Sequence, residues 1–113
     1  VHCTHHCGAL GSGVVIVFDT TVSAVDVLEW LLRFFRFESC GKCTPCREGT
    51  YIAHRIAERI ARSKGQPGDL QELHRLATML ANTSLCGLGQ SVALPIQTAI
   101  IHFADDFKRC GAT

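Results

Sequence analysis

Residues 38–50 read "ESCGKCTPCREGT", in which Cys40, Cys43 and Cys46 recur at every third position. A fourth cysteine, Cys86, follows much later in the chain, after two further segments with helical periodicity. Three thiolates on one tight loop can each reach a different corner of a small inorganic cluster, and a distant fourth can close it. The spacing therefore predicts one [4Fe–4S] site built from two separate loops.

The same stretch contains the expected start of a helix. Thr44 can serve as its N-cap and Pro45 as its first helical residue. This would place Cys43 and Cys46 beside the unpaired N–H groups of the first turn. A helix N-terminus carries about half a positive charge, which favours thiolate over thiol. We therefore expect the positive end of a helix to face the metal group.

Other residues near the cysteines agree with a metal site. Lys42 and Arg47 add positive charge beside a group held by four anionic sulfurs. Gly41, Gly87 and Gly89 would let the backbone approach the metal without an intervening Cβ. The local sequence thus supports a bound cluster both by its positive charge and by glycines that leave room for the metal group.

Three alternatives to a cluster use the same cysteines. A structural zinc ion also accepts four thiolates, although a triple C-x2-C-x2-C fits tetrahedral zinc poorly. A thioredoxin-like C-x-x-C needs a preceding strand, whereas a long helix is expected here. A bacterial ferredoxin run would place the fourth cysteine close to the third, but "REGTY" follows Cys46. The zinc alternative, a zinc-stabilised helical interaction domain without redox activity, stays open.

Helical periodicity extends on both sides of the cysteine loop. The segment 24–38, "AVDVLEWLLRFFRFE", follows the possible N-caps Thr21 and Ser23. It has Val25, Leu28, Leu32 and Phe35 at helical spacing and Trp30, Phe34 and Phe37 on other faces. Because it is apolar on several sides, we expect it to be largely buried. The next helix should run from the loop to the turn "SKGQPG" at 63–68, with Gly65 as its C-cap. Its apolar stripe comprises Ile52, Ile56 and Ile60, beside Ala53, Ala57 and Ala61.

Two more helices are expected in the second half of the chain. Asp69 should cap a helix that ends at 82–84, with a stripe of Leu70, Leu73, Leu76, Ala77 and Leu80. The last segment, "SVALPIQTAIIHFADDFKR" at 91–109, has Ile96, Ile100, Phe103 and Phe107 on one face. Pro95 should either begin a new helix after a short first turn or kink this one.

The region before the helices contains one short β-branched run. Val14–Phe18, "VVIVF", is bounded by Gly13 and Asp19 and predicts a strand. A lone strand has no partner, so we expect it to be the remnant of an upstream sheet. The predicted organisation is a remnant at 1–20 and a mainly α, four-helix bundle-like domain at 21–113. The stretch "VHCTHHC" at 1–7 matches no metal motif that we can assign.

Composition restricts the function further. The 113 residues have a formal net charge of +1 without a basic block, so a nucleic-acid partner is not expected. The longest apolar run, 25–37, is interrupted by charged residues, so we expect no direct membrane insertion. An odd count of seven cysteines favours reduced thiols in a soluble, cytoplasmic protein. No secretory signal is visible, and a start at Val1 predicts a fragment.

Three stretches together resemble one known family. "FESCGKCTPCREGT" at 37–50 resembles the signature of the iron–sulfur domain in the NADH-oxidising flavoprotein subunit of NADH:quinone oxidoreductase, the 51 kDa or F subunit. The family includes the diaphorase subunits of NAD(P)-linked soluble hydrogenases and formate dehydrogenases. "SLCGLGQS" at 84–91 resembles the family's fourth-ligand segment, and "LGSGVVIVFD" at 10–19 resembles the end of its β-grasp domain.

The resemblance implies a ligand set and a place in an oxidoreductase. Cys40, Cys43, Cys46 and Cys86 would be the ligands of one [4Fe–4S] cluster. That cluster would accept electrons from FMN reduced by NADH and pass them to the next iron–sulfur carrier in a neighbouring subunit. The flavin- and NADH-binding domain of the same subunit lies upstream in the family, so the isolated chain would lack the NADH and FMN sites.

The resemblance also implies which residues surround the cluster. On the first loop these are Gly41, Lys42, Thr44 and Arg47. On the second they are Leu85, Gly87 and Leu88, which would lie near the flavin. "CGLGQ" at 86–90 is more similar to the hydrogenase and formate dehydrogenase branch, whereas "SVALPI" at 91–96 departs from it, so both branches stay open.

Overall fold

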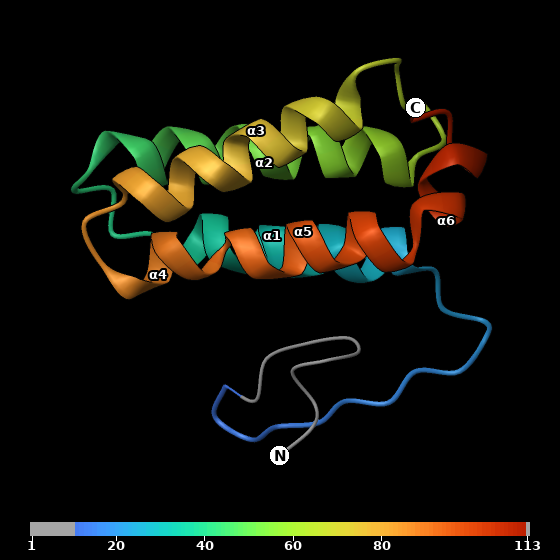
Figure 1. Cartoon of the computed structure of the whole chain (residues 1–113), viewed down its shortest axis with the longest axis horizontal. Coiled ribbons are helices and arrows are strands. Elements are labelled where there is room, and N and C mark those ends of the chain that lie inside the picture. Colours follow the sequence, from blue (N-terminus) through green and yellow to red (C-terminus); the bar gives the residue numbers. More distant parts are fainter. Residues whose placement is uncertain (1–10, 113) are drawn as a thin grey trace.

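The computed structural model describes residues 11–112, which form a mainly helical domain, as predicted. Its helices are α1 (Ala24–Glu38), α2 (Thr44–Ala61), α3 (Asp69–Thr83), α4 (Gly87–Ser91), α5 (Ala93–His102) and α6 (Ala104–Arg109). The four longer helices form two layers, α1 beside α5 and α2 beside α3, with α6 at one end (Figure 1). The predicted bundle is therefore confirmed.

The core lies between the two layers and is formed by the predicted stripes. One side of each helix faces it, because apolar residues three and four apart share a helix face. The buried stripe residues are Val25, Leu28, Leu32, Ala53, Ile56, Ala57, Ile60, Leu73, Leu76, Ala77, Leu80, Ile96 and Phe107. Ile52 and Phe103, which were also expected in these stripes, are exposed.

The first helix is less buried than its sequence predicted. Of the two candidate N-caps, Ser23 caps α1, and its Oγ accepts the Val25 amide at 3.2 Å. Trp30, Phe34 and Phe37 point away from the core and are at least half exposed. The expectation that this helix is largely buried is therefore wrong within the described chain, because a two-layer bundle covers only one side of α1.

Both ends of α2 differ from the prediction. The helix begins at Thr44, with Cys43 rather than Thr44 as N-cap, so Pro45 is the second helical residue. Proline is tolerated there because the first-turn amides have no intrahelical acceptor. At the other end Ser63, not Gly65, adopts the left-handed conformation, with φ 58°. The Ser63 and Lys64 amides donate back to helix carbonyls in the Schellman pattern, and this stops α2 early.

Gly65 serves packing instead of capping. Its amide donates to the Cys110 carbonyl at 3.1 Å, and a Cβ on this residue would lie 2.7 Å from the Ala112 amide nitrogen. Glycine at this position therefore lets the turn after α2 contact the backbone at the end of α6.

The start of α3 is also shifted by one residue, because Gly68 is the N-cap and Asp69 is the first helical residue. The Asp69 carboxylate accepts the Gln66 amide at 2.8 Å and forms an ion pair with Arg59 of α2. These partners hold the carboxylate away from the first-turn amides that a capping side chain would bind. The predicted end, at 82–84, is confirmed.

The last predicted helix, 91–109, is broken into α5 and α6, and α4 precedes it with an overlap only at Ser91. The expected short turn before Pro95 does not form a separate helix; α5 begins at Ala93, so Pro95 is its third residue. The break between α5 and α6 occurs at Phe103, with φ −126° and ψ 31°. This break turns Phe103 out of the stripe and lets Phe107 enter the core from α6.

The expected strand does not form. Residues 14–18 have no strand pairing within the described chain, and their side chains are exposed. A strand requires backbone hydrogen bonds to a neighbour, and no described segment supplies them. The stretch "VHCTHHC" lies outside the described residues. Among the helices of residues 11–112, none is long and apolar enough to cross a bilayer.

Candidate iron–sulfur site

The first cysteine loop joins α1 to α2 and presents its three thiols at different depths. Cys40 is exposed, Cys43 is half-buried and Cys46 is buried in the first turn of α2. The left-handed conformation of Gly41, with φ 75°, turns the chain between the first two cysteines. At the end of α1, the Ser39 Oγ lies 3.2 Å from the Cys46 Sγ.

Arg47 holds this loop in place. Its Nη1 donates to the Gly41 carbonyl at 2.6 Å, and its Nη2 donates to the Thr44 hydroxyl at 3.4 Å. Its Nε also donates to the Glu48 carboxylate at 3.2 Å. The sequence predicted Arg47 as a positive charge beside the cluster, and the structure adds that its guanidinium crosslinks the loop to the helix that follows.

The second cysteine loop joins α3 to α4 and lies at the same end of the bundle as the first (Figure 1). Cys86 is exposed and is the N-cap of α4. The backbone amide of Leu85, and to a smaller extent that of Cys46, lowers the pKa of the Cys43 thiol, because each N–H stabilises the thiolate charge. The residue before Cys86 therefore lies near a cysteine of the first loop.

Gly89 allows the two loops to pack closely. A Cβ at this buried position would lie 2.4 Å from the Ser84 Oγ and 3.1 Å from the Cys46 Cβ. The backbone of Ser84 is held on both sides, since its amide donates to the Leu80 carbonyl and its carbonyl accepts the Gln90 amide group at 3.0 Å. The Ser84 hydroxyl itself is buried and has no hydrogen-bond partner within residues 11–112.

The chemistry of these residues is compatible with a bound iron–sulfur cluster. The four thiols come from two loops at the same end of the bundle (Figure 1), and the Leu85 backbone amide favours the thiolate form of Cys43. Across the described chain, no three His, Cys, Asp or Glu side chains gather closely enough to hold a single metal ion.

The remaining predicted residues lie around this end of the molecule. Lys42 and Gly87 are exposed and Leu88 is half-buried. Leu85 exposes 77% of its surface although it is apolar. The second loop therefore has an exposed apolar side chain at its surface. Cys110 is half-buried and packs against the core directly after α6, and α6 lies at the opposite end of the bundle (Figure 1).

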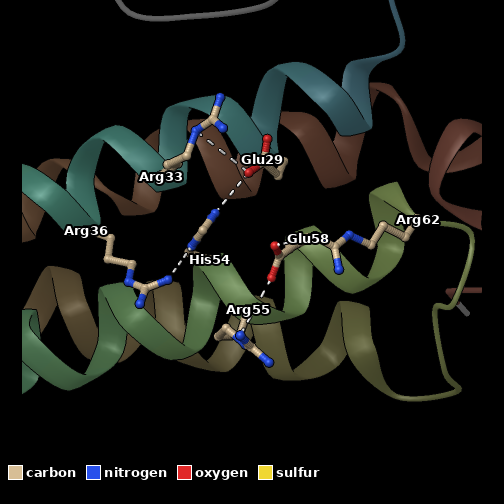
Figure 2. Close-up of polar contacts among 7 residues, drawn as sticks. All are labelled: Glu29, Arg33, Arg36, His54, Arg55, Glu58 and Arg62. Atoms are coloured by element: carbon tan, nitrogen blue, oxygen red, sulfur yellow. Dashed lines mark hydrogen bonds and ion pairs between the residues drawn. The ribbon is translucent and has the colours of Figure 1, made fainter.

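Sequence reasoning missed a buried polar residue between α1 and α2. His54 is 4% exposed; its Nε2 lies 2.9 Å from the Glu29 Oε1 and its Nδ1 lies 3.0 Å from the Arg36 Nη1 (Figure 2). A guanidinium can only donate, so Nδ1 accepts and Nε2–H donates to the carboxylate. Histidine usually lies at surfaces on a helix like α2, and only its spacing from the buried Thr50 indicated the inner face.

Comparison with known families gives one match over most of the chain. The family model described as "NADH-ubiquinone oxidoreductase-F iron-sulfur binding region" matches residues 26–110. The match begins in α1 and ends after α6, so it includes both cysteine loops.

Individual relatives agree with this family. The chain is 37% identical over 98 residues to the F subunit of the NADH-quinone oxidoreductase of Mycobacterium tuberculosis, covering 87% of this chain and 22% of the relative. It is 39% identical over 99 residues to the NADP-reducing hydrogenase subunit HndC of Solidesulfovibrio fructosivorans, covering 88% and 20%.

A solved structure shares the fold. The NAD+-reducing [NiFe]-hydrogenase in its H2-reduced state contains a chain that superposes with a TM-score of 0.82 at 35% sequence identity. The superposition covers 88% of this chain and 17% of that one. The present sequence thus spans about a fifth of the length of the curated relatives it matches.

Proposed function

The chain belongs to the family of NADH-ubiquinone oxidoreductase-F iron-sulfur binding regions, and on this basis we propose that it carries electrons through one [4Fe–4S] cluster. The proposed ligands are Cys40, Cys43, Cys46 and Cys86. When bound, such a cluster takes up one electron and releases it again, with a potential that its protein surroundings set.

The observation that carries this proposal is the contact between the two cysteine loops. The Leu85 amide lies near enough to the first loop to lower the pKa of the Cys43 thiol. Gly89 packs against both Ser84 and Cys46, which supports the same juxtaposition. Helices α3 and α4 hold the fourth cysteine at the end of the bundle where the other three are, and four thiolates are the donor set of a cubane cluster.

The place of the chain in a larger enzyme is part of the proposal. We propose that residues 1–20 belong to a preceding domain and residues 21–113 form the cluster domain. The parent subunit would bind NADH and FMN upstream and deliver electrons to this cluster. A neighbouring iron–sulfur subunit would then accept the electrons from the cluster. The exposed Leu85 and the half-buried Leu88 would face the flavin of the parent subunit. The setting would be cytoplasmic, in a soluble enzyme or the peripheral arm of a membrane complex.

Anaerobic reconstitution with iron and sulfide tests the cluster directly. The purified chain should bind four irons and four sulfides and give a paramagnetic signal after one-electron reduction. Cys86→Ala should lose the cluster or make it labile. Cys110→Ala is the matched control, because this cysteine is half-buried and far from both loops, and its iron and sulfide content should equal that of the wild type.

Two outcomes would contradict the proposal. Zinc bound without sulfide would favour the zinc-stabilised interaction domain. A Cys86→Ala protein with full iron content and an unchanged spectrum would show that the second loop supplies no ligand.

A further inference from the structure

Two serines lie beside the most buried of the four cysteines. Ser39, at the end of α1, places its Oγ 3.2 Å from the Cys46 Sγ. The Ser39 hydroxyl also accepts the Gly41 amide at 3.4 Å, so its own hydrogen is left free for the sulfur. A thiolate carries no hydrogen and can only accept, so Ser39 must be the donor to Cys46 once that thiol is ionised.

Ser84 approaches from the second loop with an unsatisfied hydroxyl. Its residue is 6% exposed, and its Oγ has no hydrogen-bond partner within the described chain. Leaving such a buried group unpaired destabilises the fold. The Oγ lies against the bare Cα of Gly89, the same surface that the Cys46 Cβ contacts. The unsatisfied donor of Ser84 therefore lies beside Cys46, where a sulfur-rich group would be bound.

We infer that Ser39 and Ser84 are potential-setting residues: their hydroxyls donate hydrogen bonds to sulfur at the cluster site and raise its reduction potential. Ser39 would donate to the Cys46 thiolate and Ser84 to sulfur of the bound group. This inference rests on the proposed function, because without a cluster neither hydroxyl has a redox centre to act on.

The direction of the effect follows from charge. Reduction adds one electron to a group already held by four anionic sulfurs, so a donor hydrogen bond stabilises the reduced form more than the oxidised form. Removing either donor should therefore favour the oxidised form and lower the potential.

The test is a redox titration of the cluster-loaded chain, followed by the paramagnetic signal of the reduced form. Ser39→Ala and Ser84→Ala should each shift the one-electron equilibrium threefold to tenfold, about 30–60 mV lower at 59 mV per tenfold. Ser39→Thr keeps a hydroxyl and should retain the wild-type potential. Ser91→Ala is the matched control, since Ser91 is exposed on α4 and its Oγ donates to the Leu88 carbonyl at 2.8 Å.

The outcomes separate this inference from the proposed function. A wild-type chain that binds no iron and sulfide would overturn both. A loaded wild type whose potential equals those of Ser39→Ala and Ser84→Ala would overturn only the inference. If Ser84→Ala binds no cluster, the reduction potential of Ser39→Ala alone tests the inference. An unchanged potential in Ser39→Ala then overturns it. Iron content, measured on every sample, excludes partial loading as the source of a shift.

Discussion

Gly89→Ala should disturb the packing between the two cysteine loops. The new Cβ would lie 2.4 Å from the Ser84 Oγ, 2.6 Å from the Ser84 Cβ and 3.1 Å from the Cys46 Cβ. The Oγ can rotate away, but the Ser84 Cβ cannot, because the Ser84 amide and carbonyl are both held by hydrogen bonds. Helix α4 must therefore move, and Cys86, its N-cap, moves with it.

The magnitude follows from two opposing effects. Overpacking a filled site costs about 1–3 kcal/mol. Replacing glycine by alanine inside a helix returns up to about 1 kcal/mol. Gly87→Ala, in the same helix, meets no atom within 4 Å and therefore receives only the second, favourable effect. The free energies of unfolding of the two variants should consequently differ by about 1–3 kcal/mol, with Gly89→Ala the less stable.

Urea unfolding of the iron-free protein, followed by far-ultraviolet circular dichroism, measures this difference. Ser84→Gly in the Gly89→Ala background removes the two atoms that clash and should recover most of the loss, which a double-mutant cycle would quantify. Equal unfolding free energies for Gly87→Ala and Gly89→Ala would refute the close packing of the loops. The same conclusion would follow if Ser84→Gly gave no recovery.

Three further predictions concern the loop, the buried histidine and pH. Arg47→Lys should speed iron loss to a chelator, because an ammonium cannot span the loop carbonyl and the threonine hydroxyl as the guanidinium does; an unchanged rate would argue against the crosslink. His54→Ala should lower the free energy of unfolding by about 1–3 kcal/mol, since it removes the hydrogen bonds to Glu29 and Arg36 and leaves Glu29 only its 3.9 Å ion pair with Arg33. An unshifted urea midpoint would contradict this. Arg75 lowers the pKa of Glu72, so the stabilisation from this pair is complete above the ordinary glutamate pKa and is lost as the pH falls through the lowered value. Glu72→Gln should therefore show a smaller loss of stability in acid than the wild type, as thermal unfolding against pH would measure.

The helices themselves were predictable from local pattern. Stripes such as Leu28 with Leu32, or Leu73 with Leu80, are buried because residues that share a helix face must be covered together. Helix ends were less predictable. Asp69 fits the sequence preference of an N-cap but is bound by Arg59 of another helix, and Ser63 takes the left-handed position expected of Gly65. For Asp69 a contact with another helix decided the outcome, and for Ser63 the backbone hydrogen bonds that close α2 decided it.

The exposure of α1 is a related case. Trp30, Phe34 and Phe37 indicated a helix buried on several sides, yet they face outward in the described chain. A sequence pattern states which side chains favour burial, but it does not state which of them a given arrangement of neighbours covers. The strand expected at 14–18 is a second example, because β-branched residues favour extended backbone while pairing depends on a partner.

The sequence by itself predicted a candidate donor set and determined the class of the domain: a triple cysteine loop between two amphipathic helices, a later fourth cysteine, and the residues that give the loop its turn and charge. These depend on residue type and spacing over a few positions. Only the tertiary structure decided that Leu85 reaches Cys43, that Gly89 brings Ser84 against Cys46, and that the Ser84 hydroxyl is left without a partner in the described chain. These contacts join residues some forty positions apart, and their geometry depends on how α2, α3 and α4 pack, which no local pattern encodes.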